Sequence, residues 1–127
     1  SGGEVLHGMK AGDVGFSGFG EAYLSTVEFQ AIKGWKRHHS MTMNIIVPIG
    51  SIKFVLFDNR KKSLSRGAFF SVTLSPENYC RVTVPPKIWL AFQGLTHEKN
   101  ILLNIADICH APDEVDSLPL CEIDYQW

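Results

Sequence analysis

The chain has 127 residues, a formal net charge of −1, 45% hydrophobic and 20% charged residues, which is ordinary for a single globular domain. This balance excludes a strongly basic protein that attracts nucleic acid or a membrane surface through its overall charge, so any recognition of an anion must be local. No apolar run reaches the roughly 18 residues that a membrane span needs. The three cysteines, Cys80, Cys109 and Cys121, cannot all pair within one chain and lack CxxC spacing, so we expect reduced thiols in a cytoplasmic protein.

Almost all elements predicted along the chain are β-strands. Residues 1–3 (Ser-Gly-Gly) resemble a cloning remnant, no signal peptide opens the sequence, and four glycines between residues 8 and 18 favour turns over helix. Strands rich in β-branched and aromatic residues are expected over residues 21–29, 41–47, 52–57, 68–74, 79–84, 88–93 and 100–108.

The connections complete this prediction. Residues 48–51 (Pro-Ile-Gly-Ser) are expected to form the turn of a hairpin that pairs residues 41–47 with 52–57. Residues 113–118 are expected to be a surface loop or a helical turn, and residues 122–127 a final edge strand. Short strands at regular spacing indicate an all-β sandwich or barrel, with residues 1–127 as one domain.

A basic cluster stands just before the strand at residues 41–47. Gly34 is expected to break the chain, and after Trp35 come Lys36, Arg37 and His38. If this stretch is a regular extended segment, Lys36 and His38 point to one side, while Arg37 and His39 point to the other. The cluster therefore predicts a charged wall of a pocket.

Several short motifs, taken together in their order along the chain, resemble those of a known protein family. They are Lys33-Gly34-Trp35, the turn at Gly50, Leu74-Ser75-Pro76-Glu77-Asn78, Pro85-Pro86-Lys87-Ile88-Trp89 and Tyr125-Gln126-Trp127. Over roughly residues 20–127 the chain resembles the RmlC-like cupins, namely the dTDP-4-dehydrorhamnose 3,5-epimerases and the related dTDP-sugar 3,4-ketoisomerases. The resemblance implies a cupin-type jelly roll, a homodimer, and a nucleotide-sugar ligand.

The chain departs from these families at their key positions. On the metal-cupin pattern, Lys36, Met43 and Leu90 stand where ligands are expected, and only His38 remains. A cupin metal needs three or four N or O donors, so we expect no metal and no cofactor. On the epimerase pattern, the catalytic base falls on Lys36, an active-site lysine on Met43, and the tyrosine acid on His110.

The residues that remain suggest proton transfer next to a ketone. That chemistry needs a base, an acid and a group that stabilises an enolate. We expect His38 to be the base, His110 the acid, and Lys36 the cation beside the enolate or itself a base. The alternatives are a surface role for either histidine and a solvated position at the pocket rim for Lys36.

Further residues are candidates for ligand binding. Cationic side chains suit a diphosphate, aromatic faces suit a base or a sugar, and amides can line the interior. These candidates are Lys33, Arg37, Arg81, Trp35, Asn44 and Asn104. Packing in the core or at a dimer interface is the favoured alternative for Trp35 and for Trp89.

The function predicted from the sequence is that of a sugar-nucleotide epimerase or ketoisomerase, acting on a nucleotide-linked 4-keto hexose without a metal. The alternative is a catalytically inactive cupin that binds a sugar nucleotide or another small anion, and a third option is a purely structural dimer module. No nucleic-acid or membrane partner is expected.

Overall fold

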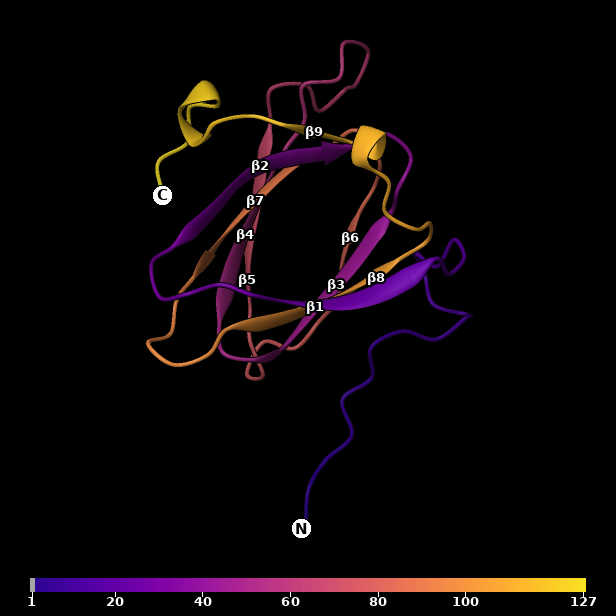
Figure 1. Cartoon of the computed structure of the whole chain (residues 1–127), viewed down its shortest axis with the longest axis vertical. Helices are drawn as coiled ribbons and strands as arrows, with labels where there is room; N and C mark the ends of the chain where they lie inside the picture. The colour runs from indigo at the N-terminus through magenta and orange to yellow at the C-terminus, as the bar shows by residue number, and fades with distance from the viewer. Residues whose placement is uncertain (1) are drawn as a thin grey trace.

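The computed structural model describes residues 2–127, so the first of the three residues interpreted as a cloning remnant lies outside the described residues. The described chain forms nine strands in two antiparallel sheets that face each other as a jelly roll (Figure 1). One sheet has the order β1-β8-β3-β6 and the other has the order β5-β4-β7-β2-β9. The prediction of an all-β sandwich or barrel is confirmed.

Seven of the nine strands lie close to where the sequence predicts them, whereas β2 and β9 were not predicted as strands. Their bounds are β1 Glu21–Thr26, β2 Ile32–His38, β3 Met43–Ile49, β4 Ile52–Phe57, β5 Phe69–Leu74, β6 Val82–Val84, β7 Trp89–Gly94, β8 Ile101–Ala106 and β9 Val115–Ser117. Two short 3-10 segments, Pro112–Glu114 and Leu120–Glu122, complete the regular structure between residues 2 and 127. Within that range no helix has the length and apolar character needed to cross a bilayer.

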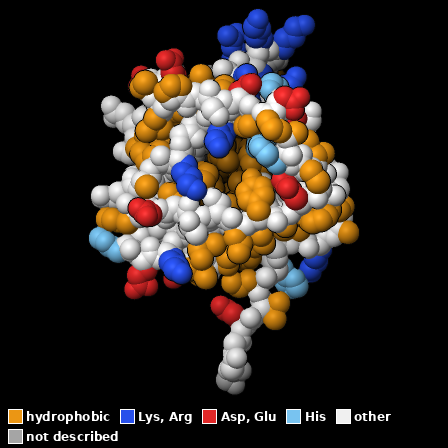
Figure 2. All heavy atoms as spheres, in the orientation of Figure 1, with side chains coloured by type: hydrophobic (Ala, Val, Ile, Leu, Met, Phe, Trp, Pro, Cys, Tyr) orange, Lys and Arg blue, Asp and Glu red, His pale blue; other side chains and the backbone are white. Residues whose placement is uncertain are grey.

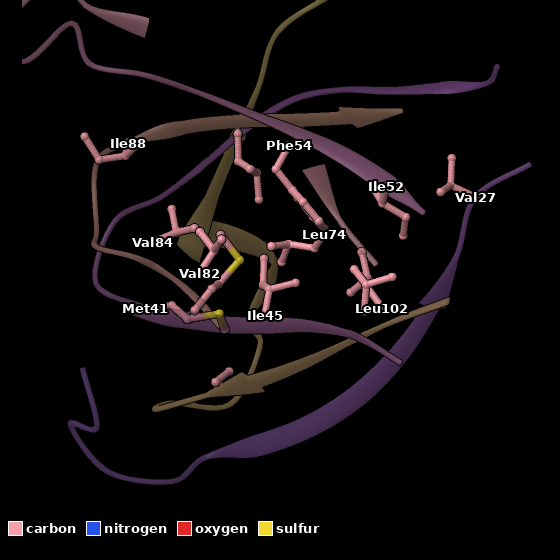
Figure 3. Close-up of a cluster of buried hydrophobic side chains, with 14 residues drawn as sticks. Val27, Met41, Ile45, Ile52, Phe54, Leu74, Val82, Val84, Ile88 and Leu102 are labelled. Carbon is pink, nitrogen blue, oxygen red and sulfur yellow. The ribbon is translucent and has the colours of Figure 1, made fainter. Parts of the chain in front are cut away.

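The main core lies between the two sheets. Side chains from both sheets point toward one another there, with Met41, Val82 and Val84 at one end and Val27, Ile52 and Leu102 at the other (Figure 3). Burial of a core side chain of this kind stabilises a fold by about 1.5–3 kcal/mol, which makes this layer the main source of stability.

A second cluster covers the outer face of the five-stranded sheet. Trp35, Val55, Trp89 and Ala91 face outward from it and are buried beneath Ile123 and its neighbours in the C-terminal segment. Trp35 donates a hydrogen bond from Nε1 to the carbonyl oxygen of Leu120, at 3.3 Å. The predicted edge strand at residues 122–127 is therefore wrong, because this segment packs across the sheet as a cover with no strand pairing.

Three other local predictions are wrong in whole or in part. The hairpin between residues 41–47 and 52–57 does not form, because β3 and β4 belong to different sheets and the turn at Gly50 carries the chain across the core. Gly34 does not break the chain, since it lies inside β2. The third prediction is wrong only in part: the loop or helical turn expected over residues 113–118 begins as the 3-10 turn Pro112–Glu114, but residues 115–117 pair with β2 as strand β9.

The crossing turn depends on Gly50 and Asn100. Gly50 has φ +84°, and a Cβ there would overlap the carbonyl oxygen of Lys99. The buried Asn100 side chain accepts a hydrogen bond from Ser51 N at 3.0 Å and donates one to the carbonyl of Val27 at 3.1 Å. This amide thus ties the turn to the end of β1, and a side chain at position 50 would separate them.

We expect Gly50→Ala to lower the free energy of unfolding by about 2–4 kcal/mol, because it combines a left-handed backbone with a steric overlap. Gly67→Ala is the matched control: its φ is +86°, but a Cβ there meets no atom within 4 Å. Its cost should be only the backbone term of about 1 kcal/mol. Urea unfolding of both variants measures the difference, and equal costs would contradict this account of the turn.

Candidate active site

A pocket of about 460 Å³ opens between the two sheets. Figure 2 shows a hollow in the middle of the face viewed, with hydrophobic side chains inside it and basic and histidine side chains around it. Strands of both sheets supply the pocket lining, which consists of Tyr23, Ser25, Lys33, Gly34, Lys36, His38, Met43, Ile45, Leu90, Phe92, Leu102 and Asn104. The floor is apolar and the polar groups stand on the walls, as in many small-molecule sites.

A bulge in β2 brings the basic residues of this wall together. Lys33 pairs with Phe92 and Lys36 with Leu90, so β2 has one more residue than β7 between these pairs. The extra residue falls at Gly34-Trp35, and glycine within a strand commonly marks such a bulge. Without it, side chains three residues apart would face opposite sides, whereas Lys33 and Lys36 both line the pocket.

The sequence correctly predicts the two faces of this segment. Lys36 and His38 line the pocket, while Arg37 lies on the opposite side of β2. There the Arg37 guanidinium stacks over the Trp89 ring at 4.5 Å and pairs with Asp116 at 2.8 Å. Arg37 therefore belongs to the outer surface, away from the barrel interior.

His38 has the most unusual environment in the pocket. Its side chain is buried, and its Nδ1 is a buried atom without a hydrogen-bond partner. Burial lowers the pKa of the imidazole below its ordinary 6.5, Glu114 opposes this shift, and the positive charges of His110, Lys36 and His39 add to it. The ring is therefore a neutral base at neutral pH.

A carboxylate stands behind this ring. Glu114 Oε1 lies 4.0 Å from His38 Nδ1 and accepts hydrogen bonds from the backbone N–H groups of Ser40 at 2.6 Å and Met41 at 2.7 Å. The Ser40 bond above all lowers the pKa of Glu114, with further lowering from Met41 and His38, so the carboxylate stays ionised. The sequence analysis missed Glu114, which reaches β2 only because β9 pairs with that strand.

Tyr23 is another polar residue of the site that was not predicted from the sequence, and so is its neighbour in the lining, Ser25. Tyr23 lies on β1, in the sheet opposite His38, and its hydroxyl accepts a hydrogen bond from Asn104 Nδ2 at 3.0 Å. Because the amide supplies that donor, the hydroxyl proton is free to point elsewhere. The sequence contains a signal for this residue: Tyr23 and Ser25 are two positions apart on a predicted strand, so they share one face.

The other predicted ligand-binding residues divide between the pocket and the outer surfaces. Lys33 and Asn104 line the pocket, whereas Trp35 is fully buried under the C-terminal segment, as in the packing alternative. Arg81 and Asn44 lie on the outer face of the four-stranded sheet. There Arg81 bonds to Asn44 Oδ1 at 3.2 Å, to Asp13 at 3.1 Å and to the Val14 carbonyl at 2.8 Å.

His110 lies near the pocket, although it is not part of its lining. Its side chain is exposed, and its backbone N–H donates to Glu21 Oε1 at 2.9 Å. Its charge is close enough to affect the pKa of His38. An acid role for His110 stays a prediction that would require the side chain to turn toward the pocket.

The four positions that correspond to cupin metal ligands do converge. Lys36, His38, Met43 and Leu90 all line the pocket, but only His38 offers a donor typical of zinc or iron sites. Nowhere in residues 2–127 do three His, Cys, Asp or Glu side chains come together as a group that could hold a metal ion.

Comparison with solved structures identifies the family. A dTDP sugar isomerase from Desulfovibrio desulfuricans G20 is 39% identical, with a TM-score of 0.90 over 94% of this chain and 76% of that one. The chain belongs to the RmlC-like cupin family. No protein-family model matches the sequence, and no curated protein does.

Other members of the RmlC-like cupin family share the fold at lower identity. The dTDP-4-dehydrorhamnose 3,5-epimerase of Bacillus anthracis is 24% identical, with a TM-score of 0.72, over 79% of this chain and 59% of that one. The Sulfolobus tokodaii enzyme of the same name is 22% identical, with a TM-score of 0.75, over 87% and 64%. The chain thus spans a little under two thirds of these epimerases, which support the fold alone.

The lowered pKa of His38 predicts how stability depends on pH. Between 6.5 and the folded-state pKa, the unfolded chain binds the proton and the folded chain does not, so unfolding free energy falls as pH falls through this window. We expect His38→Gln to flatten this loss in thermal melts between about pH 7.5 and pH 5, above the range of ordinary carboxylates. The exposed His97 provides the control, because His97→Gln should leave the slope unchanged; identical slopes in both variants would contradict the prediction.

Proposed function

We propose that the protein is a sugar-nucleotide isomerase or epimerase that removes a proton from the carbon next to the ketone of a nucleotide-linked 4-keto hexose and then returns one. The observation that carries the proposal is a single cavity with a neutral, buried imidazole on one sheet and a tyrosine hydroxyl on the other. The kinship with a dTDP sugar isomerase supports this class of substrate.

His38 is the general base in this mechanism. Glu114 favours the tautomer with the proton on Nδ1, which leaves the Nε2 lone pair for the substrate. The 4.0 Å gap between Nδ1 and Glu114 Oε1 closes to a hydrogen bond when the ring takes up a proton, since the imidazolium and the carboxylate attract each other. Glu114 is therefore a positioning residue that stabilises the protonated base.

Lys36 and Tyr23 complete the proton transfer. The proton leaves carbon for His38, the electron pair moves onto the ketone oxygen, and the Lys36 ammonium stabilises the enolate that results. Tyr23 then gives its hydroxyl proton to carbon from the opposite wall and regains one from solvent, and His38 releases to solvent the proton that it took. Its bond from Asn104 Nδ2, at 3.0 Å, stabilises the phenolate formed in between.

Lys33 supports binding of the nucleotide part of the substrate. Its Nζ donates to Ser25 Oγ at 3.1 Å across the pocket, and both side chains are at least partly exposed. A lysine at that position can meet a diphosphate while the hexose occupies the cavity. Metal independence is part of the proposal, because Lys36, Met43 and Leu90 offer no typical ligand at the positions beside His38.

Two features of the surface extend the proposal to the whole protein. We place it in the cytoplasm, where its three exposed cysteines, Cys80, Cys109 and Cys121, stay reduced.

We also propose a homodimer that covers β1 and the preceding segment. Leu24 and Phe19 are each 66% exposed there and Val14 is 93% exposed, and a partner that covers this stretch would remove their apolar surface from water.

The first test is solvent-deuterium exchange into a dTDP-4-keto-hexose, followed by mass spectrometry. His38→Asn should slow exchange by about 10²–10⁴-fold, because it removes the base. Tyr23→Phe should retain abstraction but slow the return of the proton, so product forms more slowly than substrate is labelled.

Matched variants control for the loss of a ring or a hydroxyl. His97→Asn and Tyr79→Phe change the same groups outside the pocket and should keep full activity. If His110→Asn is inactive while Tyr23→Phe is active, the acid assignment to Tyr23 is wrong. Binding of dTDP-sugars without any exchange would instead favour the inactive binding module.

The second test concerns the dimer. Leu24→Asp should convert the protein to a monomer in sedimentation velocity, since a charge cannot be buried unpaired in an apolar interface. Leu64→Asp is the control, because Leu64 is fully exposed in the loop between β4 and β5. A monomeric wild-type protein at micromolar concentration would refute the interface.

A further inference from the structure

A second concentration of positive charge lies outside the barrel, on the outer side of β2. Figure 2 shows basic side chains gathered at the top of the molecule, where Figure 1 places the loop between β4 and β5. An open groove of about 690 Å³ is lined there by Arg37, His39, Asn59, Arg60, Lys61, Lys62 and Lys87. The chain as a whole carries a net charge of only −1, so this charge is strongly local.

Both arginines of the groove are held in place. Asp58 is buried and accepts two hydrogen bonds from the Arg60 guanidinium, each at 3.0 Å, as well as one from the backbone N–H of Arg60 at 2.9 Å. The Arg60 bonds are the main cause of a strongly lowered pKa at Asp58. Arg37 is fixed between Asp116 and the Trp89 ring. A site built from fixed side chains has less conformational entropy to lose when it binds a ligand.

The lysines of the groove, by contrast, are uncompensated. Within residues 2–127, Lys61, Lys62 and Lys87 form no ion pair, and all three are exposed. The five Lys and Arg side chains, less the carboxylates of Asp58 and Asp116, leave three positive charges. Such a cluster repels itself unless an anion sits among its members.

The backbone of Lys87 adds an independent observation. Its φ is +68°, a left-handed conformation that is unfavourable for a residue with a side chain. Its N–H donates to the carbonyl of His38 at 2.7 Å, which holds this conformation beside the end of β2. Strain of this kind in a non-glycine residue concentrates at functional sites.

The lining decides the class of ligand. It contains only basic and polar side chains, whereas protein interfaces have an apolar core with aromatic anchors. Guanidinium forks and ammonium groups match the oxygens of phosphates, which carry several charges in a small volume. We propose that this groove is a binding site for a compact polyphosphate, such as a free diphosphate or triphosphate or the same group on a nucleotide.

This site is distinct from the barrel pocket, because the two share no lining residue and lie on opposite faces of β2. Its existence does not depend on the proposed isomerase activity. Its position next to Lys36 and His38 along the chain means that an occupied groove fixes the outer side of the strand that carries these two residues.

Isothermal titration of the full chain with sodium tripolyphosphate at low salt tests the proposal. We expect one site per chain in this groove. The double variant Lys61→Gln/Lys62→Gln removes two charges, and Lys87→Gln removes one. The affinity for tripolyphosphate should fall by about tenfold for each lysine removed. Adenosine triphosphate serves as the second arm, and tighter binding than for tripolyphosphate would assign the site to a nucleotide, whereas equal binding would assign it to the free polyphosphate.

Two matched variants separate this groove from other lysines. Lys99→Gln removes an exposed charge from a different loop and should leave the affinity unchanged. Lys33→Gln removes the barrel-pocket charge that is proposed to meet the substrate diphosphate, and it should also leave the affinity of the groove unchanged. If Lys33→Gln abolishes the binding, or if no heat is measured at millimolar tripolyphosphate, the proposal is overturned. Melting curves of each variant confirm that these exposed substitutions leave the fold intact.

Discussion

The arrangement of this protein depends on the bulge at Gly34-Trp35 in β2. The extra residue lets β2 present Lys33, Lys36 and His38 to the cavity while Trp35 and Arg37 face the other way. The outer face then buries Trp35 beneath the C-terminal segment, and the inner face lines the pocket with cations. A one-residue slip of the strand would reverse both faces. The packing of Trp35 on the outer side therefore also fixes which side chains of β2 face the pocket.

The second determinant is the competition around His38. Burial of the imidazole favours its neutral form, and the ionised Glu114 behind it favours the protonated form. The proposed role of His38 as a base needs both properties, because such a base must start neutral and still accept a proton in the transition state. The backbone N–H groups of Ser40 and Met41 hold the carboxylate in place, so the β2–β3 connection takes part in the site.

The sequence predicted the strands well wherever local pattern decides them. Residues 52–57 have an uninterrupted strand pattern and form β4 at those bounds. Gly34 was misinterpreted because a glycine inside a strand and a glycine that ends one look alike without the partner strand. The hairpin at Gly50 was wrong because turn residues describe the bend, whereas long-range packing decides which sheet each flanking strand joins.

The site was predicted in part for the same reasons. His38, Lys36 and Lys33 sit in one short segment, so alternation along a strand was enough to group His38 with Lys36. Asn44 was wrongly predicted to bind the ligand. Side chains alternate along a strand, so Asn44 must face away from the cavity that its neighbour Met43 lines. Glu114 reaches the site only through the pairing of β9 with β2, which nothing in its local sequence indicates. For Tyr23, alternation along its predicted strand groups it with Ser25, but the pairing of β1 with β8 that carries it to the pocket depends on a distant strand.

The pairing of β2 with β9 also has a consequence for biosynthesis. Arg37 and Asp116 are 79 residues apart in sequence. At ribosomal rates of 5–20 residues per second, β9 is therefore made about 4–16 s after β2. During that delay the aromatic face around Trp35 and Trp89 has no cover, and His38 has no carboxylate behind it. Until the C-terminal segment has been made, the nascent chain therefore exposes this apolar face on the outside of the barrel, and exposed apolar surface of this kind is prone to aggregation.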